Sequence, residues 1–139
     1  MIASLARAAD LQQLAALEAK RAQRTGRGFT LVRIAPVGWR ALESDLEVLE
    51  RIAECQLRRT DCVQRTPNRE VGIVLVDTTA VAAGVPIARV RAAAAEHLPG
   101  LQLGIGWCCV GPGESRGWQE AWRWAGTMLV ADSTVPAAA

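Results

Sequence analysis

The sequence has few of the features that define membrane, secreted or nucleic-acid-binding proteins. No apolar run reaches the roughly 18 residues that a membrane-spanning helix needs. The N-terminal stretch MIASLARAADLQQL breaks its apolar residues with Arg7 and Asp10 too early for a signal peptide. The formal net charge is only +2, which is too small to argue for binding to a nucleic-acid polymer. We therefore expect a cytoplasmic protein without direct membrane insertion.

Cysteine and histidine are also sparse. The cysteines stand at positions 55, 62, 108 and 109, and the only histidine is His97. On count alone the cysteines could form a disulfide pair or a zinc site, but they show no CxxC spacing. We expect plain thiols, which behave as small hydrophobic groups, and no metal site.

What the chain does have is the composition of a globular domain. It contains 139 residues, of which 50% are hydrophobic and 22% charged, so we expect a single domain over residues 1–139. Residues 1–24 are expected to form an N-terminal helix that is clearly amphipathic from Ser4 to Arg24 and stops at Thr25–Gly26. Residues 132–139 are expected to form a frayed tail.

Between these ends the pattern alternates strands and helices. The apolar, β-branched runs predict strands over residues 29–35, 61–65, 70–77 and 101–110. Helical spacing predicts helices over 39–58 and 117–127, with an apolar MLVA segment after the latter that could be a short strand. A further helix has N-cap candidates at residues 77–79, but Gly84 and Pro86 indicate that its regular part runs from Pro86 to His97. This order predicts an α/β domain.

Several segments in this order resemble the GGDEF, or diguanylate cyclase-like, family over nearly the whole chain. FTLVRIAP resembles the first core strand of that family, LRRTDCVQRTPNREVGIVLVDT its RxxD segment, hairpin and inner strand, and PIARVRAAA the helix that usually reads AERIRAAI. LGIGW is similar to the SIG strand and GWQEAWRWAGTML to the last helix. The resemblance implies an α+β sandwich with a mostly antiparallel central sheet flanked by helices and a shortened active-site region.

The resemblance also implies that cyclase activity is lost. An active GGDEF cyclase condenses two GTP molecules, using carboxylates to hold metal ions and a glycine turn to approach the nucleotide. Ala35 and Val37 replace the first-strand aspartates, and the segment that usually carries FKxxND and GHxxGD is shorter by roughly nine residues. The signature is degenerate and reads Pro67, Asn68, Arg69, Glu70 and Val71. Both glycines are replaced, a basic residue stands in place of the metal-binding acid, and only the glutamate is retained. We expect no catalytic residue, no metal and no cofactor, and treat a residual nucleotide enzyme as an alternative.

A second family feature is retained. Many GGDEF domains bind their product, cyclic di-GMP, at an RxxD motif five residues before the signature, and Arg58-Arg59-Thr60-Asp61 has this spacing. The family places a further arginine on the AERIR helix, at Arg89 here. The planar guanidinium of arginine can donate two hydrogen bonds to a guanine edge or a phosphate, and an aspartate can accept hydrogen bonds from guanine N–H groups. We expect a cyclic di-GMP site at Arg58, Asp61 and Arg89, with Arg59 and Arg65 as auxiliary cations. The alternative is that arginine and aspartate only cap a helix or pair with each other, in a ligand-free scaffold.

The partners implied are cyclic di-GMP and an unidentified protein or neighbouring domain, with a ligand-linked homodimer as a subsidiary hypothesis. Trp118 and Trp122 fall on one helical face while Trp124 points elsewhere. An exposed tryptophan in this helix would be a contact for a protein partner. Control of motility, exopolysaccharide or biofilm is the process that the resemblance implies.

Overall fold

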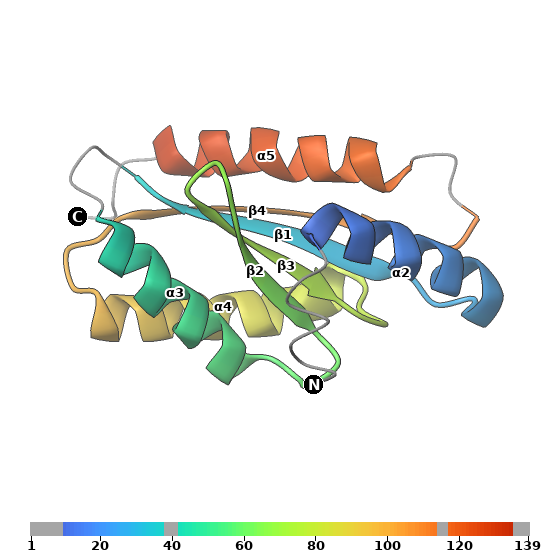
Figure 1. Ribbon diagram of the computed structural model, residues 1–139, viewed down its shortest axis with the longest axis horizontal. Helices are drawn as coiled ribbons and strands as arrows, with labels where there is room; N and C mark the ends of the chain where they lie inside the picture. Colours follow the sequence, from blue (N-terminus) through green and yellow to red (C-terminus); the bar gives the residue numbers. More distant parts are fainter. Residues whose placement is uncertain (1–9, 38–41, 114–116, 135–139) are drawn as a thin grey trace.

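The protein, seen in a computed structural model, is described for residues 10–37, 42–113 and 117–134. The elements in these ranges, in chain order, are α2 (Leu11–Thr25), β1 (Phe29–Pro36), α3 (Glu43–Gln56), β2 (Cys62–Thr66), β3 (Glu70–Leu75), α4 (Ala80–His97), β4 (Leu103–Val110) and α5 (Trp118–Thr134) (Figure 1). Residues 1–9, 39–41 and 135–139, over which the two helices and the tail were predicted to extend, lie outside the described ranges. The predicted early starts of the two helices are wrong, because Asp10 and Leu42 are extended N-cap residues and the helices begin at Leu11 and Glu43.

The strands form one antiparallel sheet in the order β2-β3-β1-β4. β1 is internal: its Val32 lies opposite Ile73 of β3 and Trp107 of β4. Strands that are covered on both faces have nearly continuous apolar sequences, and the sequence of β1 is of this type. Pro36, which has no amide hydrogen to donate, is its last residue. The expected α+β sandwich with an antiparallel central sheet is confirmed.

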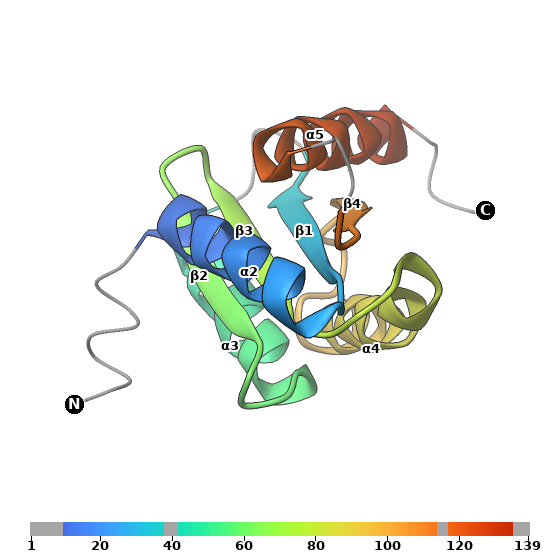
Figure 2. The same cartoon turned by 90° about the vertical axis from the view of Figure 1, so that its right-hand side faces the viewer.

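Helices cover both faces of this sheet (Figures 1 and 2). Phe29 and Leu31 of β1 belong to the core shared with α2 and α5, whereas Val32 and Ile34 belong to the core shared with α3 and α4. All four side chains are 0% exposed, so each contributes about 1.5–3 kcal/mol of burial free energy. The alternation of strand side chains between two faces therefore builds two cores from one strand.

Glycine in β4 sets how closely α5 approaches the sheet. A Cβ atom on Gly106 would lie 1.8 Å from the carbonyl oxygen of Ala125 and 2.5 Å from the amide nitrogen of Leu129. Both are backbone atoms of α5, and the backbone cannot move aside as a side chain can. The helix rests directly on the strand at this point.

The outer edge of β4 is covered by side chains from α5. The amide of Ile105 donates to Asp132 Oδ2 at 2.8 Å, and the amide of Trp107 donates to Met128 Sδ at 3.4 Å. Arg91 of α4 donates to the same Asp132 oxygen at 3.1 Å. Exposed edge amides invite pairing with other chains, so these contacts protect the edge.

The expected start of α4 near Pro86 is wrong, because the helix begins at Ala80. The Thr79 hydroxyl accepts from the amide of Ala82 at 3.2 Å, and the Thr79 carbonyl accepts from Ala83 at 2.9 Å. A proline inside a helix removes one hydrogen bond. This N-cap and the burial of Ala83 and Ile87 offset that loss.

The expected break near Thr127 is also wrong, because α5 is one helix to Thr134. The apolar segment that could have been a strand supplies Leu129, which is 7% exposed against the sheet. The frayed tail cannot begin at residue 132, because Asp132 lies within α5 and holds the β4 edge.

Candidate functional site

The residues predicted to be a degenerate signature lie at the turn of a β-hairpin between β2 and β3. Thr66 pairs with Glu70 across the hairpin, with Pro67, Asn68 and Arg69 between them. Arg69 has φ +60°, a left-handed conformation that glycine adopts without a steric cost. The turn therefore closes with an arginine in a backbone conformation that glycine would favour.

Glu70, predicted to be the retained signature acid, is bound by Arg33 of the neighbouring central strand β1. Its two carboxylate oxygens accept from Arg33 Nε at 2.8 Å and Arg33 Nη2 at 3.0 Å. The two side chains are only 12% and 15% exposed, respectively. Bidentate pairs of this kind are among the strong hydrogen-bonded contacts in proteins.

Arg33 is also held from the other side by α5. Its Nη1 donates to the Trp122 carbonyl at 3.1 Å, and its guanidinium lies 4.7 Å from the centre of the Trp122 ring. A Cβ atom on Gly126 would lie 2.3 Å from Arg33 Nη1, so glycine leaves the space that the guanidinium fills. Arg33 was not among the predicted site residues, although a charged residue inside an otherwise apolar strand is a signal that the sequence carries.

The described residues do not provide a metal site at this hairpin. The sequence resemblance predicts family aspartates at the positions of Ala35 and Val37, and Ala35 pairs with Gly104 of β4. Across residues 10–37, 42–113 and 117–134, no three histidine, cysteine or acidic side chains gather in a group that could hold an ion. The one acid at the signature, Glu70, already binds Arg33 with both oxygens. These residues do not fit the metal ions that the resemblance implies for an active cyclase.

The RxxD motif forms a tight turn between α3 and β2. The Asp61 carboxylate accepts from the amide of Arg58 at 3.1 Å and from the amide of Val76 at 3.0 Å. Its two oxygens also accept from Arg58 Nε and Nη2, each at 3.4 Å. The side chain of Asp61 is only 2% exposed, so its first role is to tie this turn to the end of the inner strand.

Arg58 extends the same network to the start of α4. Its Nη2 donates to the Val76 carbonyl and, at 2.9 Å, to the Thr78 hydroxyl. The Arg58 side chain as a whole is nevertheless 59% exposed. Thr78 was proposed only as an N-cap candidate, and its contact with Arg58 depends on tertiary structure.

The expected trio lies around one groove. Arg58, Asp61 and Arg89 line a hollow of about 260 Å³ between the RxxD turn and α4, together with Gln56, Leu57, Leu75, Asp77, Thr78, Ala82, Val85 and Pro86. Arg59 is exposed and does not line it. Arg65 lies elsewhere, because its guanidinium pairs with Glu43 and, at 3.9 Å, with Glu50.

Asp77 brings α2 to the rim of this groove. Arg21 and Arg27 each approach its carboxylate at 3.9 Å. The pKa of the nearby Glu18 is raised, first because burial penalises its charged form; Asp77 raises it further, while Arg21 opposes the rise. The negative charge of Asp77 is therefore offset by Arg21 of α2 and by Arg27, which follows α2, rather than by groove residues.

The Trp-rich helix divides as its spacing predicts. Trp118 and Trp122 pack against the core on the α2 and α5 side, whereas Trp124 is 53% exposed. Trp124 lines a shallow hollow of about 360 Å³ with Trp107, Cys108 and Met128 among its neighbours. The predicted exposure of one tryptophan is confirmed; its contact with a partner stays a prediction.

No family model matches this sequence, and no curated protein matches it significantly. Solved structures do match. The FimX GGDEF domain from Pseudomonas aeruginosa has a TM-score of 0.75 at 16% identity, over 88% of this chain and 85% of that one. The chain has the GGDEF fold. The coiled coil and GGDEF domain of DgcB from Caulobacter crescentus, solved with c-di-GMP, match with a TM-score of 0.76 at 10% identity, over 86% of this chain and 72% of that one.

The diguanylate cyclase SiaD from Pseudomonas aeruginosa, solved in complex with its activator SiaC, has the same fold. Its TM-score is 0.74 at 20% identity, over 86% of this chain and 52% of that one. The chain thus spans about half the length of SiaD. At these identities the likeness establishes the fold alone. In the described ranges, no helix is long and apolar enough to cross a membrane.

Proposed function

We propose that this chain is a catalytically inactive GGDEF-fold domain that binds cyclic di-GMP at the groove beside its RxxD turn and passes that signal to a protein partner or neighbouring domain. The observation that carries the proposal is the convergence of Arg58, Asp61 and Arg89 on one hollow. These residues come from segments about 30 positions apart in the sequence, and only the fold brings them together.

The loss of catalysis rests on the chemistry of the signature hairpin. Phosphoryl transfer from GTP needs metal ions, and metal ions need free carboxylates. Arg69 replaces one acid with a positive charge, Ala35 and Val37 replace others, and Arg33 occupies both oxygens of Glu70. A triphosphate placed here would lie near Arg69 and the Arg33–Glu70 pair, and these residues would not hold a metal ion against its phosphates.

The proposed ligand contacts come mainly from arginine. Arg58 and Arg89 present exposed guanidinium groups that match a guanine edge or a phosphate. Asp61 positions Arg58, and its 3.4 Å contacts with the guanidinium are long enough to be exchanged for guanine N–H donors. The hollow of about 260 Å³ holds part of a cyclic dinucleotide, so the remainder would lie at the surface.

A ligand-free scaffold is the second candidate, and one observation favours it. Arg58 already donates to Asp61, Val76 and Thr78 within the chain. An RxxD turn with its hydrogen bonds complete in this way has a structural role without any ligand. In this candidate the domain serves to dock a partner, and the groove stays empty in solution.

Isothermal titration of cyclic di-GMP into the 139-residue chain tests the proposal, with GTP as the control ligand. We expect micromolar or tighter binding that Arg58→Ala and Arg89→Ala each weaken by about tenfold or more. Arg123→Ala, which removes an exposed arginine on α5, is the matched control and should bind normally.

If the folded chain shows no binding of cyclic di-GMP, the receptor hypothesis is wrong and the ligand-free scaffold is favoured. Incubation with GTP and magnesium or manganese tests the loss of catalysis separately, because any cyclic di-GMP formed would contradict it. If Arg58→Ala bound cyclic di-GMP with full affinity, binding would be established but the assigned site would be wrong.

A further inference from the structure

Among the described residues that line the groove beside the RxxD turn, Asp61 and Asp77 carry carboxylates. Guanine presents N–H donors at N1 and N2 on its Watson–Crick edge, whereas adenine presents an acceptor at N1. An ionised carboxylate has acceptors only, so it pairs with the two guanine donors and repels adenine N1. The carboxylate that is available to a ligand therefore decides whether the groove selects guanine.

Asp61 has little accepting capacity left. Its Oδ1 accepts from the amide of Val76 at 3.0 Å, and its Oδ2 accepts from the amide of Arg58 at 3.1 Å. Each oxygen also accepts from the Arg58 guanidinium at 3.4 Å. These contacts use the roughly four acceptor sites of a carboxylate, and the side chain is only 2% exposed. A base can reach Asp61 only after the Arg58 guanidinium has moved away from it.

Asp77 is in the opposite situation. Its side chain is 27% exposed, and the guanidinium groups of Arg21 and Arg27 stay at 3.9 Å, beyond hydrogen-bond distance. Within the part of the chain that the structure describes, the Asp77 carboxylate makes no hydrogen bond. It is therefore an ionised acceptor in the groove lining that a ligand can use without displacing an internal hydrogen bond.

We infer that Asp77 selects guanine in this groove by accepting hydrogen bonds from N1 and N2 of one base of cyclic di-GMP. The inference rests on the proposed function, because it names the specificity determinant of the same site. Arg58 and Arg89 line the same groove and remain donors to the phosphates. Arg21 and Arg27 lower the electrostatic cost of placing a dianionic ligand beside the Asp77 carboxylate.

Two other polar side chains of the groove are less selective. The Gln56 amide presents either its oxygen or its nitrogen after a half-turn, so it can pair with guanine or with adenine. The Thr78 hydroxyl already donates to the Val76 carbonyl at 2.8 Å and accepts from Arg58 Nη2 at 2.9 Å. Neither group distinguishes the two bases as an ionised carboxylate does.

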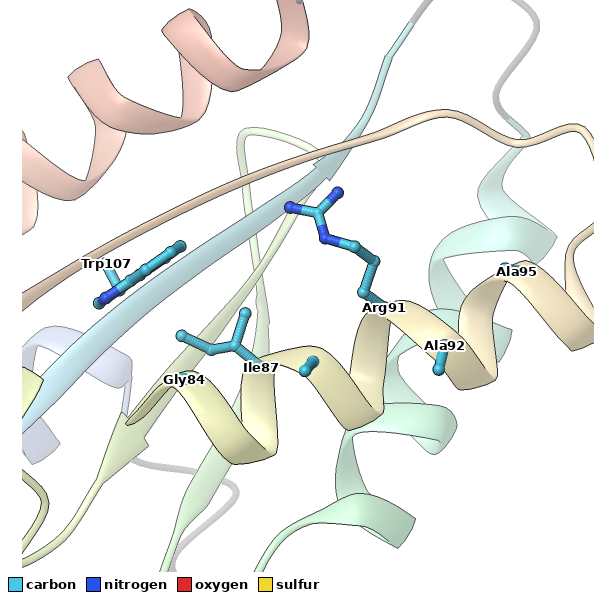
Figure 3. A pocket seen from close by; sticks show the side chains of 7 residues that line it. Gly84, Ile87, Arg91, Ala92, Ala95 and Trp107 are labelled. Atoms are coloured by element: carbon cyan, nitrogen blue, oxygen red, sulfur yellow. The ribbon is translucent and has the colours of Figure 1, made fainter. Parts of the chain in front are cut away.

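A second hollow along α4 lacks these acceptors. It has a volume of about 440 Å³, and Figure 3 shows Ile87 and Arg91 of α4 beside Trp107 of β4 in its lining. No carboxylate is among the described residues that line it, and Arg91 already pairs with Asp132 at 3.1 Å. We therefore expect selection of guanine at the groove beside the RxxD turn and not at this hollow.

Isothermal titration of cyclic di-GMP and cyclic di-AMP into the full chain tests the inference, because the two ligands differ only in their bases. The wild type should bind cyclic di-GMP at least about tenfold more tightly. Asp77→Asn should lower this preference by about tenfold or more, through weaker binding of cyclic di-GMP. Asparagine is the suitable replacement, since Asp77 has φ +50° and asparagine tolerates this conformation. Glu120→Gln removes the same charge from an exposed position on α5 and should leave both affinities unchanged.

Asp61→Asn is the comparison variant, and its preference for guanine should fall less than that of Asp77→Asn. An unchanged preference in Asp77→Asn, or a larger loss of preference in Asp61→Asn, would overturn the inference. Tighter binding of both ligands by Asp77→Asn would also overturn it, because the carboxylate would then only repel phosphates. If the folded wild type binds neither ligand, the proposed function itself is wrong and the inference falls with it.

Discussion

Replacing Glu70 by glutamine removes the charge that neutralises Arg33 while preserving the shape of the side chain. The two partners are 12% and 15% exposed, and they share two hydrogen bonds of 2.8 and 3.0 Å. Breaking a fully buried pair costs about 3–5 kcal/mol, because one charge is left without compensation. Since both side chains retain some contact with water, we expect Glu70→Gln to lower the free energy of unfolding by about 2–3 kcal/mol.

A double-mutant cycle of Arg33→Met, Glu70→Leu and the double variant Arg33→Met/Glu70→Leu separates the pair from its surroundings. Each single variant should cost at least about as much as Glu70→Gln, because it leaves one charge without its partner, and Arg33→Met also loses the contacts with the Trp122 carbonyl and ring. The double variant should lie within about 1 kcal/mol of the wild type, since neither charge then remains buried. The coupling energy between the two positions is therefore expected to be about 2 kcal/mol or more.

Urea unfolding monitored by circular dichroism measures these free energies directly, and thermal melting provides a second readout. A loss of about 2–3 kcal/mol corresponds to a fall in Tm of roughly 6–12 °C for a domain of this size. The reasoning is refuted if Glu70→Gln unfolds within about 0.5 kcal/mol of the wild type, which is the range of ordinary surface substitutions. Binding of magnesium or manganese that disappears in Glu70→Gln would also refute it, because the carboxylate would then be free for a metal.

Two further predictions concern packing and pH. Gly106→Ala should destabilise the fold by about 3 kcal/mol or more, measured by urea unfolding, because the new methyl group would overlap backbone atoms of α5; a neutral result would mean that α5 is not seated on β4 as described. Burial raises the pKa of Glu18 in the folded chain, so its charged form destabilises the fold above that pKa and the penalty disappears as pH falls below its unfolded value. Glu18→Gln should therefore be more stable than the wild type near pH 7, by no more than about 1 kcal/mol, with the difference shrinking as pH falls toward 4.

The sequence predicted the strands and most helix positions because their signals are local. β1 is an apolar, β-branched run that ends at a proline, and α2 ends at Gly26, whose φ of +74° suits glycine. The start of α4 was misplaced because Pro86 is a strong local signal, whereas the Thr79 cap and the burial of Ala83 depend on the rest of the fold. Local rules fail where tertiary contacts outweigh them.

The candidate site was predictable only in part. The spacing of RxxD and the position of Arg89 follow from the order of segments, and the fold places these residues around one groove. Arg65 was grouped with them because it is near in sequence, but strand alternation points it toward Glu43 and Glu50. The engagement of Asp61 with Val76 could not be foreseen, because hydrogen bonds between distant backbone and side-chain atoms leave no trace in spacing.

The pairing of Arg33 with Glu70 gives Glu70 a structural role that does not involve catalysis. Arg33 lies within the central strand, and its guanidinium needs a negative partner because burial of an unpaired charge is costly. Glu70 is that partner, and Gly126 leaves the space for the guanidinium beneath the Trp122 ring. Glu70 therefore has a structural role in this chain, because it neutralises a guanidinium that is mostly buried in the central strand.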